Sequence, residues 1–100
     1  MISKSKIKYF RSLKHKKYRE LSNEFLIEGT RIVSSALEAN TFLRTVLITD
    51  SFKDSPSSQN ILKDLDKVGI SIKVVNNKTM KSIATTEHPS GIAGICSLPE

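Results

Sequence analysis

Four short apolar runs alternate with segments of helical periodicity, and this alternation limits the folds open to the chain more than any other feature. The clearest run, Leu43–Thr49, is rich in β-branched and aliphatic residues, and it is apolar on both faces, as expected for a strand that is covered on both sides. Strands that alternate with helices predict an α/β fold, a three-layer α/β/α sandwich around a central, mostly parallel four-stranded sheet.

The apolar spacing also predicts where the individual elements lie. Strands are expected at residues 25–27, 43–49, 70–75 and 91–98, and helices at 30–39, 59–68 and from Asn76 or Asn77 to about 84. Residues 50–60 are rich in serine and are expected to form an exposed loop, in which Ser57 or Ser58 caps the next helix.

The N-terminal segment is predicted to form a helical arm over residues 3–22. Ser3 or Ser5 caps a helix whose buried stripe contains Ile7, Phe10 and Leu13, with Lys4, Lys8 and Arg11 on the opposite side. A second helical segment follows at residues 16–21. Its expected orientation places Tyr18 and Leu21 inward and Lys17 and Arg19 outward.

Positive charge is concentrated in this arm. Half of the sixteen basic residues lie within it: Lys4, Lys6, Lys8, Arg11, Lys14, Lys16, Lys17 and Arg19. No acidic residue precedes Glu20, so no i,i+4 ion pairs are expected to neutralise the run, and the rest of the chain carries eight bases against ten acids. A polyanionic partner, most often a nucleic acid, fits this asymmetry, although a solvated helix face is the alternative.

Other classes of function lack support in the sequence. One hundred residues allow one domain, and no apolar run reaches the ~20 residues that span a bilayer, so a cytoplasmic protein with no membrane partner is expected. The single cysteine, Cys96, falls in an expected buried strand, and no Cys/His cluster has metal-ligand spacing. No catalytic grouping and no glycine-rich phosphate loop is found, so neither a catalytic residue nor a cofactor is assigned to this chain.

Two further positions are candidates for nucleic-acid contact. Gly29 lies between an expected strand and helix, where free backbone N–H groups can meet a phosphate, and Arg31 adds charge there. Tyr9 is the aromatic residue most open to stacking on a base. Glu28 is expected to act structurally, by forming an ion pair with a basic side chain such as Arg19. The alternative is that its carboxylate accepts a hydrogen bond from a nucleobase.

Several motifs in a fixed order resemble the N-terminal substrate-binding domain of SpoU (TrmH-type) RNA 2′-O-ribose methyltransferases. The most specific are Lys-x-Arg followed by Phe-Leu-x-Glu-Gly-x-Arg, and Pro-x-Gly-Ile near the end. The matching stretches are Ile7-Lys8, Lys16-Lys17-Tyr18-Arg19, Phe25-Leu26-Ile27-Glu28-Gly29-Thr30-Arg31, Ala36-Leu37, Thr86 and Pro89-Ser90-Gly91-Ile92-Ala93. Ser90 stands where the family pattern has glutamine.

The resemblance implies a fold like that of the ribosomal proteins that bind kinked RNA. One RNA-binding edge would combine Gly29, Thr30 and Arg31 with the loop His88, Pro89, Ser90 and Gly91. Residues 1–98 would recognise RNA, with ribosomal RNA favoured, and residues 99–100 would begin the linker to a missing knotted domain. That domain would bind S-adenosylmethionine, transfer the methyl group and form the homodimer, while the isolated chain would be a monomer.

Two readings compete with this one. A stand-alone protein that binds structured RNA, with no enzyme attached, would share the same surface. A protein-interaction module with a basic helix would instead bind an acidic protein and show little preference for structured RNA over heparin.

Overall fold

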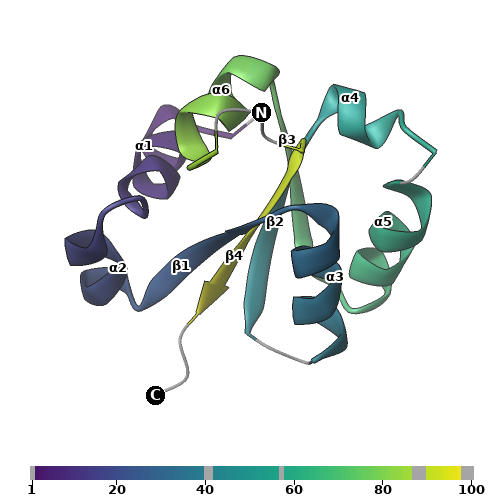
Figure 1. Cartoon of the computed structure of the whole chain (residues 1–100), viewed down its shortest axis with the longest axis horizontal. Helices are drawn as coiled ribbons and strands as arrows, with labels where there is room; N and C mark the ends of the chain where they lie inside the picture. The colour runs from purple at the N-terminus through teal and green to yellow at the C-terminus, as the bar shows by residue number, and fades with distance from the viewer. Residues whose placement is uncertain (1, 40–41, 57, 87–89, 98–100) are drawn as a thin grey trace.

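The computed structural model describes residues 2–39, 42–56, 58–86 and 90–97, which hold six helices and four strands. In chain order these are α1 (Lys4–Ser12), α2 (Lys16–Ser22), β1 (Glu24–Glu28), α3 (Thr30–Glu38), β2 (Leu43–Thr49), α4 (Asp50–Lys53), α5 (Ser58–Lys67), β3 (Ser71–Val75), α6 (Asn77–Ile83) and β4 (Ile92–Ser97). Figure 1 shows α1 and α6 on one face of the sheet and α3 and α5 on the other. The predicted three-layer α/β/α sandwich with four strands is confirmed.

The direction of the strands differs from the prediction. The sheet order is β1-β4-β2-β3, and β2 pairs parallel with β3, whereas β4 runs antiparallel to both β1 and β2. The sheet is therefore mixed, and the expectation of a mostly parallel sheet was wrong. The seven residues of α6 advance the chain by only ~10 Å, and α6 stays at the end of the sheet where β3 finishes (Figure 1), so β4 enters from that end.

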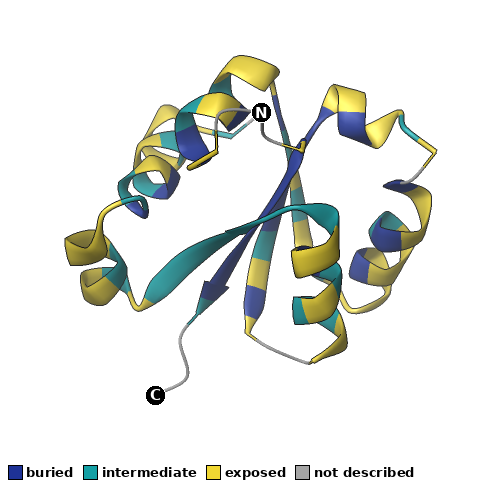
Figure 2. Ribbon diagram, in the orientation of Figure 1, coloured by how far each residue is buried: buried dark blue, intermediate teal, exposed yellow. Residues whose placement is uncertain are grey.

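Each face of the sheet carries its own hydrophobic core. On β2, Val46 and Ile48 point to the α3–α5 side, whereas Leu47 points to the α1–α6 side. Figure 2 shows the buried residues along the centre of the sheet and the exposed ones on the outer faces of the helices. The prediction that this strand is covered on both sides is confirmed. Cys96 is buried in β4, and this burial raises the pKa of its thiol.

Two helix starts agree with the sequence in atomic detail. The Ser3 side chain accepts a hydrogen bond from the Lys6 N–H at 3.2 Å, and the Asn76 side chain accepts one from the Thr79 N–H at 2.7 Å. These caps begin α1 and α6, as expected from their residue types. None of the helices in the described part of the chain is long and apolar enough to cross a membrane.

Residues 50–60 do not form the expected exposed loop. The Thr49 side chain accepts a hydrogen bond from the Phe52 N–H at 3.2 Å and caps the four-residue helix α4, and Phe52 is buried. Ser58 begins α5 and is fully buried, with its hydroxyl donating to the carbonyls of Lys53 and Ser55. A single helical turn is too short to show periodicity, so the serine-rich composition misled the prediction. Ser57, the other candidate cap, lies outside the described residues.

Candidate nucleic-acid interface

The outer side of α1 is a row of cations. Phe10 and Leu13 are buried against the sheet, while Lys4, Lys8 and Arg11 are exposed on the opposite side, as the spacing predicted. The helix therefore packs through one stripe and leaves its charges in solvent.

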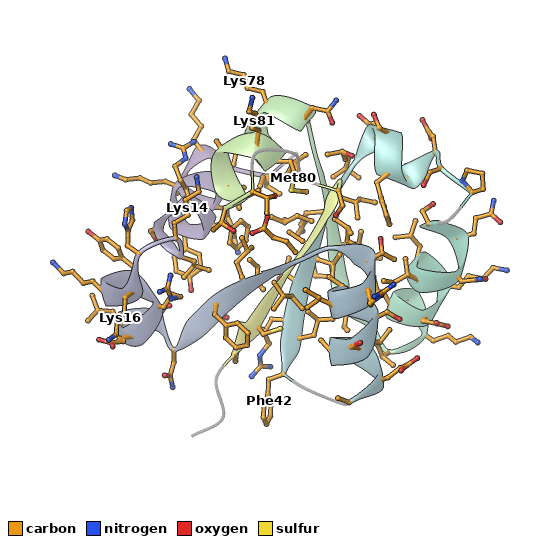
Figure 3. The ribbon with its side chains drawn as sticks, in the orientation of Figure 1. Lys14, Lys16, Phe42, Lys78, Met80 and Lys81 are labelled. Atoms are coloured by element: carbon orange, nitrogen blue, oxygen red, sulfur yellow. The ribbon has the colours of Figure 1, made fainter. Side chains whose placement is uncertain are left out.

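Helix α6 extends this row with two lysines that the sequence analysis did not select. Helix α6 packs against α1, and Arg11 Nη2 donates to Ser82 Oγ at 3.4 Å. Lys78 and Lys81 precede and follow the buried Met80 in the sequence, and both lie on the outer side of α6, away from Met80 (Figure 3). Their spacing of three residues on a short amphipathic helix was the signal that could have identified them. Together, Lys4, Lys8, Arg11, Lys78 and Lys81 are called the basic face.

Arg19 does not face outward as predicted. It is half-buried, and its Nη1 donates to the carbonyls of Leu13 and Lys14, both at 2.9 Å. The turn at residues 13–15 breaks the helical phase between α1 and α2, so Arg19 rather than Tyr18 faces the body of the domain. Its guanidinium joins the two helices of the arm instead of meeting solvent.

The two tyrosines have exchanged their expected places. Tyr18 is 43% exposed and Leu21 is 74% exposed, so the prediction that they face inward was wrong. Tyr9 is partly buried, and its hydroxyl donates to the carboxylate of Glu24. Burial and this hydrogen bond raise the pKa of Tyr9. Tyr18 is therefore the more available aromatic surface of the arm.

Lys14, Lys16 and Lys17, the other lysines of the arm near α2, differ in their exposure and in their contacts with neighbouring side chains. Lys17 is exposed, with Nζ 5.8 Å from the centroid of the Tyr18 ring, and Lys14 is half-buried. Lys16 Nζ lies 3.8 Å from Glu20 Oε1, so the expectation that no i,i+4 ion pair neutralises the run was wrong at its last turn. Both partners are well exposed, and such pairs contribute little to stability.

The predicted RNA edge is brought together by the sheet. Gly29 has φ +102°, and a Cβ built on it would lie 3.9 Å from Ser90 Oγ. The Gly29 N–H donates to the Ile92 carbonyl at 3.1 Å, which ties the end of β1 to the start of β4. Arg31 is exposed in the first turn of α3. The residues Gly29, Thr30, Arg31, Ser90 and Gly91 are called the glycine edge.

Gly91 has a structural reason to be glycine. Its φ is +90°, and a Cβ there would lie 2.9 Å from Thr49 Oγ1 and 3.0 Å from Phe52 Cβ. It is buried, and its carbonyl accepts a hydrogen bond from the Thr49 N–H at 3.0 Å. Gly91 therefore allows the backbone of the glycine edge to pack closely against Thr49 and Phe52. His88 and Pro89, which the resemblance also placed here, lie outside the described residues.

Glu28 acts structurally, but with partners other than the predicted Arg19. Its carboxylate accepts from the Thr85 N–H at 3.0 Å, from the Thr85 hydroxyl and from the Thr86 hydroxyl at 3.2 Å. Partial burial acts to raise the pKa of Glu28, but these hydrogen bonds outweigh it and leave the pKa below its ordinary value. The carboxylate thereby fixes Thr85 and Thr86, which follow α6, against the end of β1.

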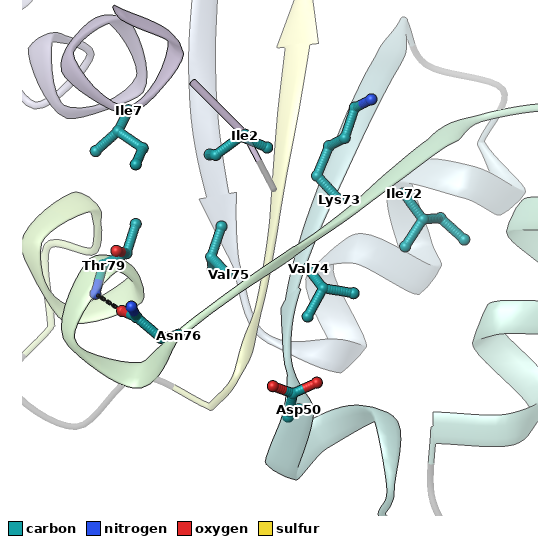
Figure 4. A pocket seen from close by; sticks show the side chains of 9 residues that line it. All are labelled: Ile2, Ile7, Asp50, Ile72, Lys73, Val74, Val75, Asn76 and Thr79. Carbon is teal, nitrogen blue, oxygen red and sulfur yellow. Dashed lines mark hydrogen bonds between the residues drawn. The ribbon is translucent and has the colours of Figure 1, made fainter. Parts of the chain in front are cut away.

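Two grooves on the surface differ in chemistry. The first, of about 540 Å³, lies at the β3 edge and is lined largely by aliphatic side chains, with Asp50 and Lys73 supplying opposite charges (Figure 4). The second, of about 650 Å³, is lined by Ser5, Lys8, Tyr9, Arg11, Ser12, His15 and Tyr18. The second groove, here called the arm groove, combines cations with aromatic rings. Across the described residues, no group of three or more His, Cys, Asp or Glu side chains could hold a metal ion.

The sequence matches the MRM3-like substrate binding domain over residues 4–94, so the chain belongs to this family. The 23S rRNA (guanosine(2553)-2′-O)-methyltransferase RlmP of Bacillus subtilis (strain 168) is 32% identical to it over 95 residues. These residues are 95% of this chain but 35% of that enzyme. The chain thus spans about a third of the length of this relative.

Solved structures share the fold at lower identity. The crystal structure of an RNA 2′-O ribose methyltransferase matches with a TM-score of 0.80 and 24% identity, over 98% of this chain and 36% of that one. The AdoMet-bound rRNA methyltransferase from Sinorhizobium meliloti matches with a TM-score of 0.77 and 22% identity, over 99% of this chain and 35% of that one. The α/β architecture is therefore that of one domain within longer proteins.

Proposed function

We propose that this chain is the RNA-recognition part of a SpoU-type rRNA 2′-O-ribose methyltransferase. The observation that carries the proposal is the basic face, because it brings together five exposed cations of α1 and α6 in a domain from a substrate-binding family. The relative's rRNA substrate supports ribosomal RNA as the ligand. A cytoplasmic location accords with that ligand.

The two surfaces would divide the work of recognition. Lysines and arginine on the basic face would neutralise phosphates and supply most of the affinity in a salt-dependent way. The glycine edge would read the path of the RNA backbone through the Thr30 hydroxyl, the Arg31 guanidinium and the free N–H groups at the start of α3. Contacts of this second kind position the RNA rather than read its sequence.

Methyl transfer is assigned to a part of the protein outside this chain. The chain spans 35% of RlmP and 35% of the AdoMet-bound methyltransferase, so most of each of those proteins lies outside the matched region. No step of the reaction is placed on this chain. Cofactor binding and homodimer formation would belong to a further domain, and the isolated chain would be a monomer.

The test is the binding of the 100-residue chain to a hairpin fragment of 23S rRNA that contains guanosine 2553, measured by fluorescence anisotropy across a salt series. Arg31→Glu should weaken binding. It should also lower the salt slope, which is the steepness with which the logarithm of the binding constant falls with the logarithm of the salt concentration, by about 0.7–0.9 for one lost phosphate contact. Lys63→Glu on α5 makes the same kind of charge reversal on an exposed residue outside the glycine edge and the basic face, and it should leave the slope unchanged. Equal losses in both variants, or binding to heparin as tight as to the hairpin, would overturn the proposal.

A further inference from the structure

We infer that the arm groove takes one unstacked nucleobase from a single-stranded stretch of RNA. In this arrangement the base contacts the ring of Tyr18, and Lys8 and Arg11 meet the adjacent phosphates. The inference rests on the proposed function, because it assigns to the same RNA a groove that shares Lys8 and Arg11 with the basic face and adds an exposed aromatic ring.

The aromatic wall of the groove is open and held in place. Tyr18 is 43% exposed, its ring lies 6.4 Å from that of His15 in an edge-on arrangement, and Lys17 lies over it. The two hydrogen bonds from Arg19 to the carbonyls of Leu13 and Lys14 fix α2 against the end of α1. The Tyr18 ring is thus presented to solvent by a helix that is tied to its neighbour.

The part of the groove that α1 lines is equally fixed. Tyr9 is anchored by its hydroxyl on Glu24, and the Ser12 hydroxyl donates to the Tyr9 carbonyl at 2.5 Å. The Tyr9 and Ser12 hydroxyls are thus hydrogen-bonded within the protein and set the shape of the groove. Recognition of a ligand is left to the exposed side chains. The volume of about 650 Å³ is within the ~300–1,000 Å³ typical of small-ligand sites.

The charge of the groove selects an anion. Lys8 and Arg11 are exposed and line it from α1, and no acidic side chain is among its described lining residues. Single-stranded nucleic acids are bound by this combination, in which bases stack on aromatic side chains and cations follow the backbone. An acidic peptide would use the cations but would leave the exposed ring without a planar partner, so RNA is the occupant that uses both features.

The absence of tryptophan from the sequence gives a direct reporter. In Tyr18→Trp, the new indole is the only one in the chain, and a base stacked on it should quench its fluorescence. The probes are a uridine hexaribonucleotide and an abasic hexamer with the same phosphates. We expect quenching by the uridine hexamer and little by the abasic one.

Affinity measurements on the otherwise unaltered chain provide the second readout. Tyr18→Leu should weaken binding of the uridine hexamer about tenfold or more, as expected for the loss of one base–aromatic stack. Tyr18→Phe should bind within about threefold of the unaltered chain, because it keeps the ring. Leu21→Ala is the matched control, since Leu21 is an exposed side chain on the same helix and is not among the described lining residues. Circular dichroism confirms that each variant is folded.

The outcomes separate this inference from the proposed function. If the 23S hairpin binds and responds to Arg31→Glu, but hexamer affinity is the same in Tyr18→Leu and the unaltered chain, the groove assignment is wrong and the proposed function stands. If neither RNA binds more tightly than heparin, both are wrong. Equal quenching by the abasic hexamer, or tighter binding of a hexaglutamate peptide than of the uridine hexamer, would also overturn the groove assignment.

Discussion

The basic face and the glycine edge are both candidate RNA surfaces, but different parts of the chain build them. The basic face consists of side chains that extend into solvent from α1 and α6, and its helices are held by buried residues such as Phe10 and Met80 on their other side. The glycine edge carries the exposed Arg31 side chain, but its shape is set by backbone, with positive φ at Gly29 and Gly91 and hydrogen bonds between strand ends. Charge on the first surface can change without affecting the fold, whereas the second is inseparable from it.

This difference predicts how each surface contributes to recognition. Exposed lysines supply affinity that falls with salt and depends little on where each charge lies. A rigid backbone edge accepts only an RNA whose phosphates follow its shape, so it supplies selectivity. The comparison of the two surfaces is therefore tested by variants in which the free energy of unfolding and RNA binding are measured separately.

The largest effect is expected for Gly91→Ala in the glycine edge. The new Cβ would meet Thr49 Oγ1 at 2.9 Å and Phe52 Cβ at 3.0 Å, at a φ of +90°. Crowding and backbone strain together should lower the free energy of unfolding by about 3–4 kcal/mol. Gly69→Ala is the control, because it has φ +74° but no described atom within 4 Å of a new Cβ, and it should cost about 1 kcal/mol. Urea unfolding measures both, and similar losses would show that the packing at Gly91 is loose.

The next largest effect is expected for Arg19. This residue belongs to the N-terminal arm, but like the glycine edge it contributes to the stability of the fold. Arg19→Ala removes both hydrogen bonds to the carbonyls of Leu13 and Lys14 and should lower the free energy of unfolding by about 2 kcal/mol. Arg19→Lys keeps the charge but not the planar guanidinium, so most of the loss should remain. Thermal unfolding measures the change. Full stability in Arg19→Ala, together with a lower salt slope for RNA, would return Arg19 to the phosphate-binding residues.

A smaller and pH-dependent effect is expected for Glu28. Glu28→Gln should cost about 1 kcal/mol at pH 7, because the hydrogen bonds from Thr85 and Thr86 lose a charged acceptor. The pKa of Glu28 is lowered in the folded state, so its contribution is complete above the ordinary value of 4.5 and is lost as the pH falls through the folded pKa. Unfolding curves of both proteins should therefore converge at acid pH. A gap that widens on acidification would contradict this sign.

The smallest effect on stability is expected on the basic face. Lys8→Ala should change the free energy of unfolding by less than about 0.5 kcal/mol, because the side chain is exposed. The same variant should lower the salt slope of RNA binding by about 0.7–0.9. Lys63→Ala on α5, which is also exposed, should change neither quantity. A loss of stability in Lys8→Ala would show that the basic face, like the edge, is part of the fold.

Local patterns in the sequence were reliable where each residue's own chemistry decides the structure. Ser3 and Asn76 begin helices because their side chains accept hydrogen bonds from nearby N–H groups, and β2 has the predicted bounds because its residues favour a buried strand. The loop predicted at residues 50–60 was wrong because one turn of helix, capped by Thr49 and held by the buried Phe52, has no periodicity to read.

The orientation of side chains and strands was harder to predict from the sequence than the positions of the elements. Tyr18 and Arg19 are neighbours in sequence, and a rotation of one residue about the axis of α2 exchanges which of them faces the domain. The direction of β4 was likewise open, because connection length alone does not say from which end a strand enters the sheet. Lys78 and Lys81 joined the basic face only because α6 packs against α1.

The sequence by itself determined the alternation of strands and helices, the helix caps and the concentration of charge in the arm, because each of these depends on residues close together in the chain. Tertiary structure alone decided the antiparallel insertion of β4, the exposure of Tyr18 and the meeting of Gly29 with Ser90. Those features arise from contacts between residues far apart in sequence, and the packing of the two cores on the sheet determines which of the locally allowed arrangements is adopted.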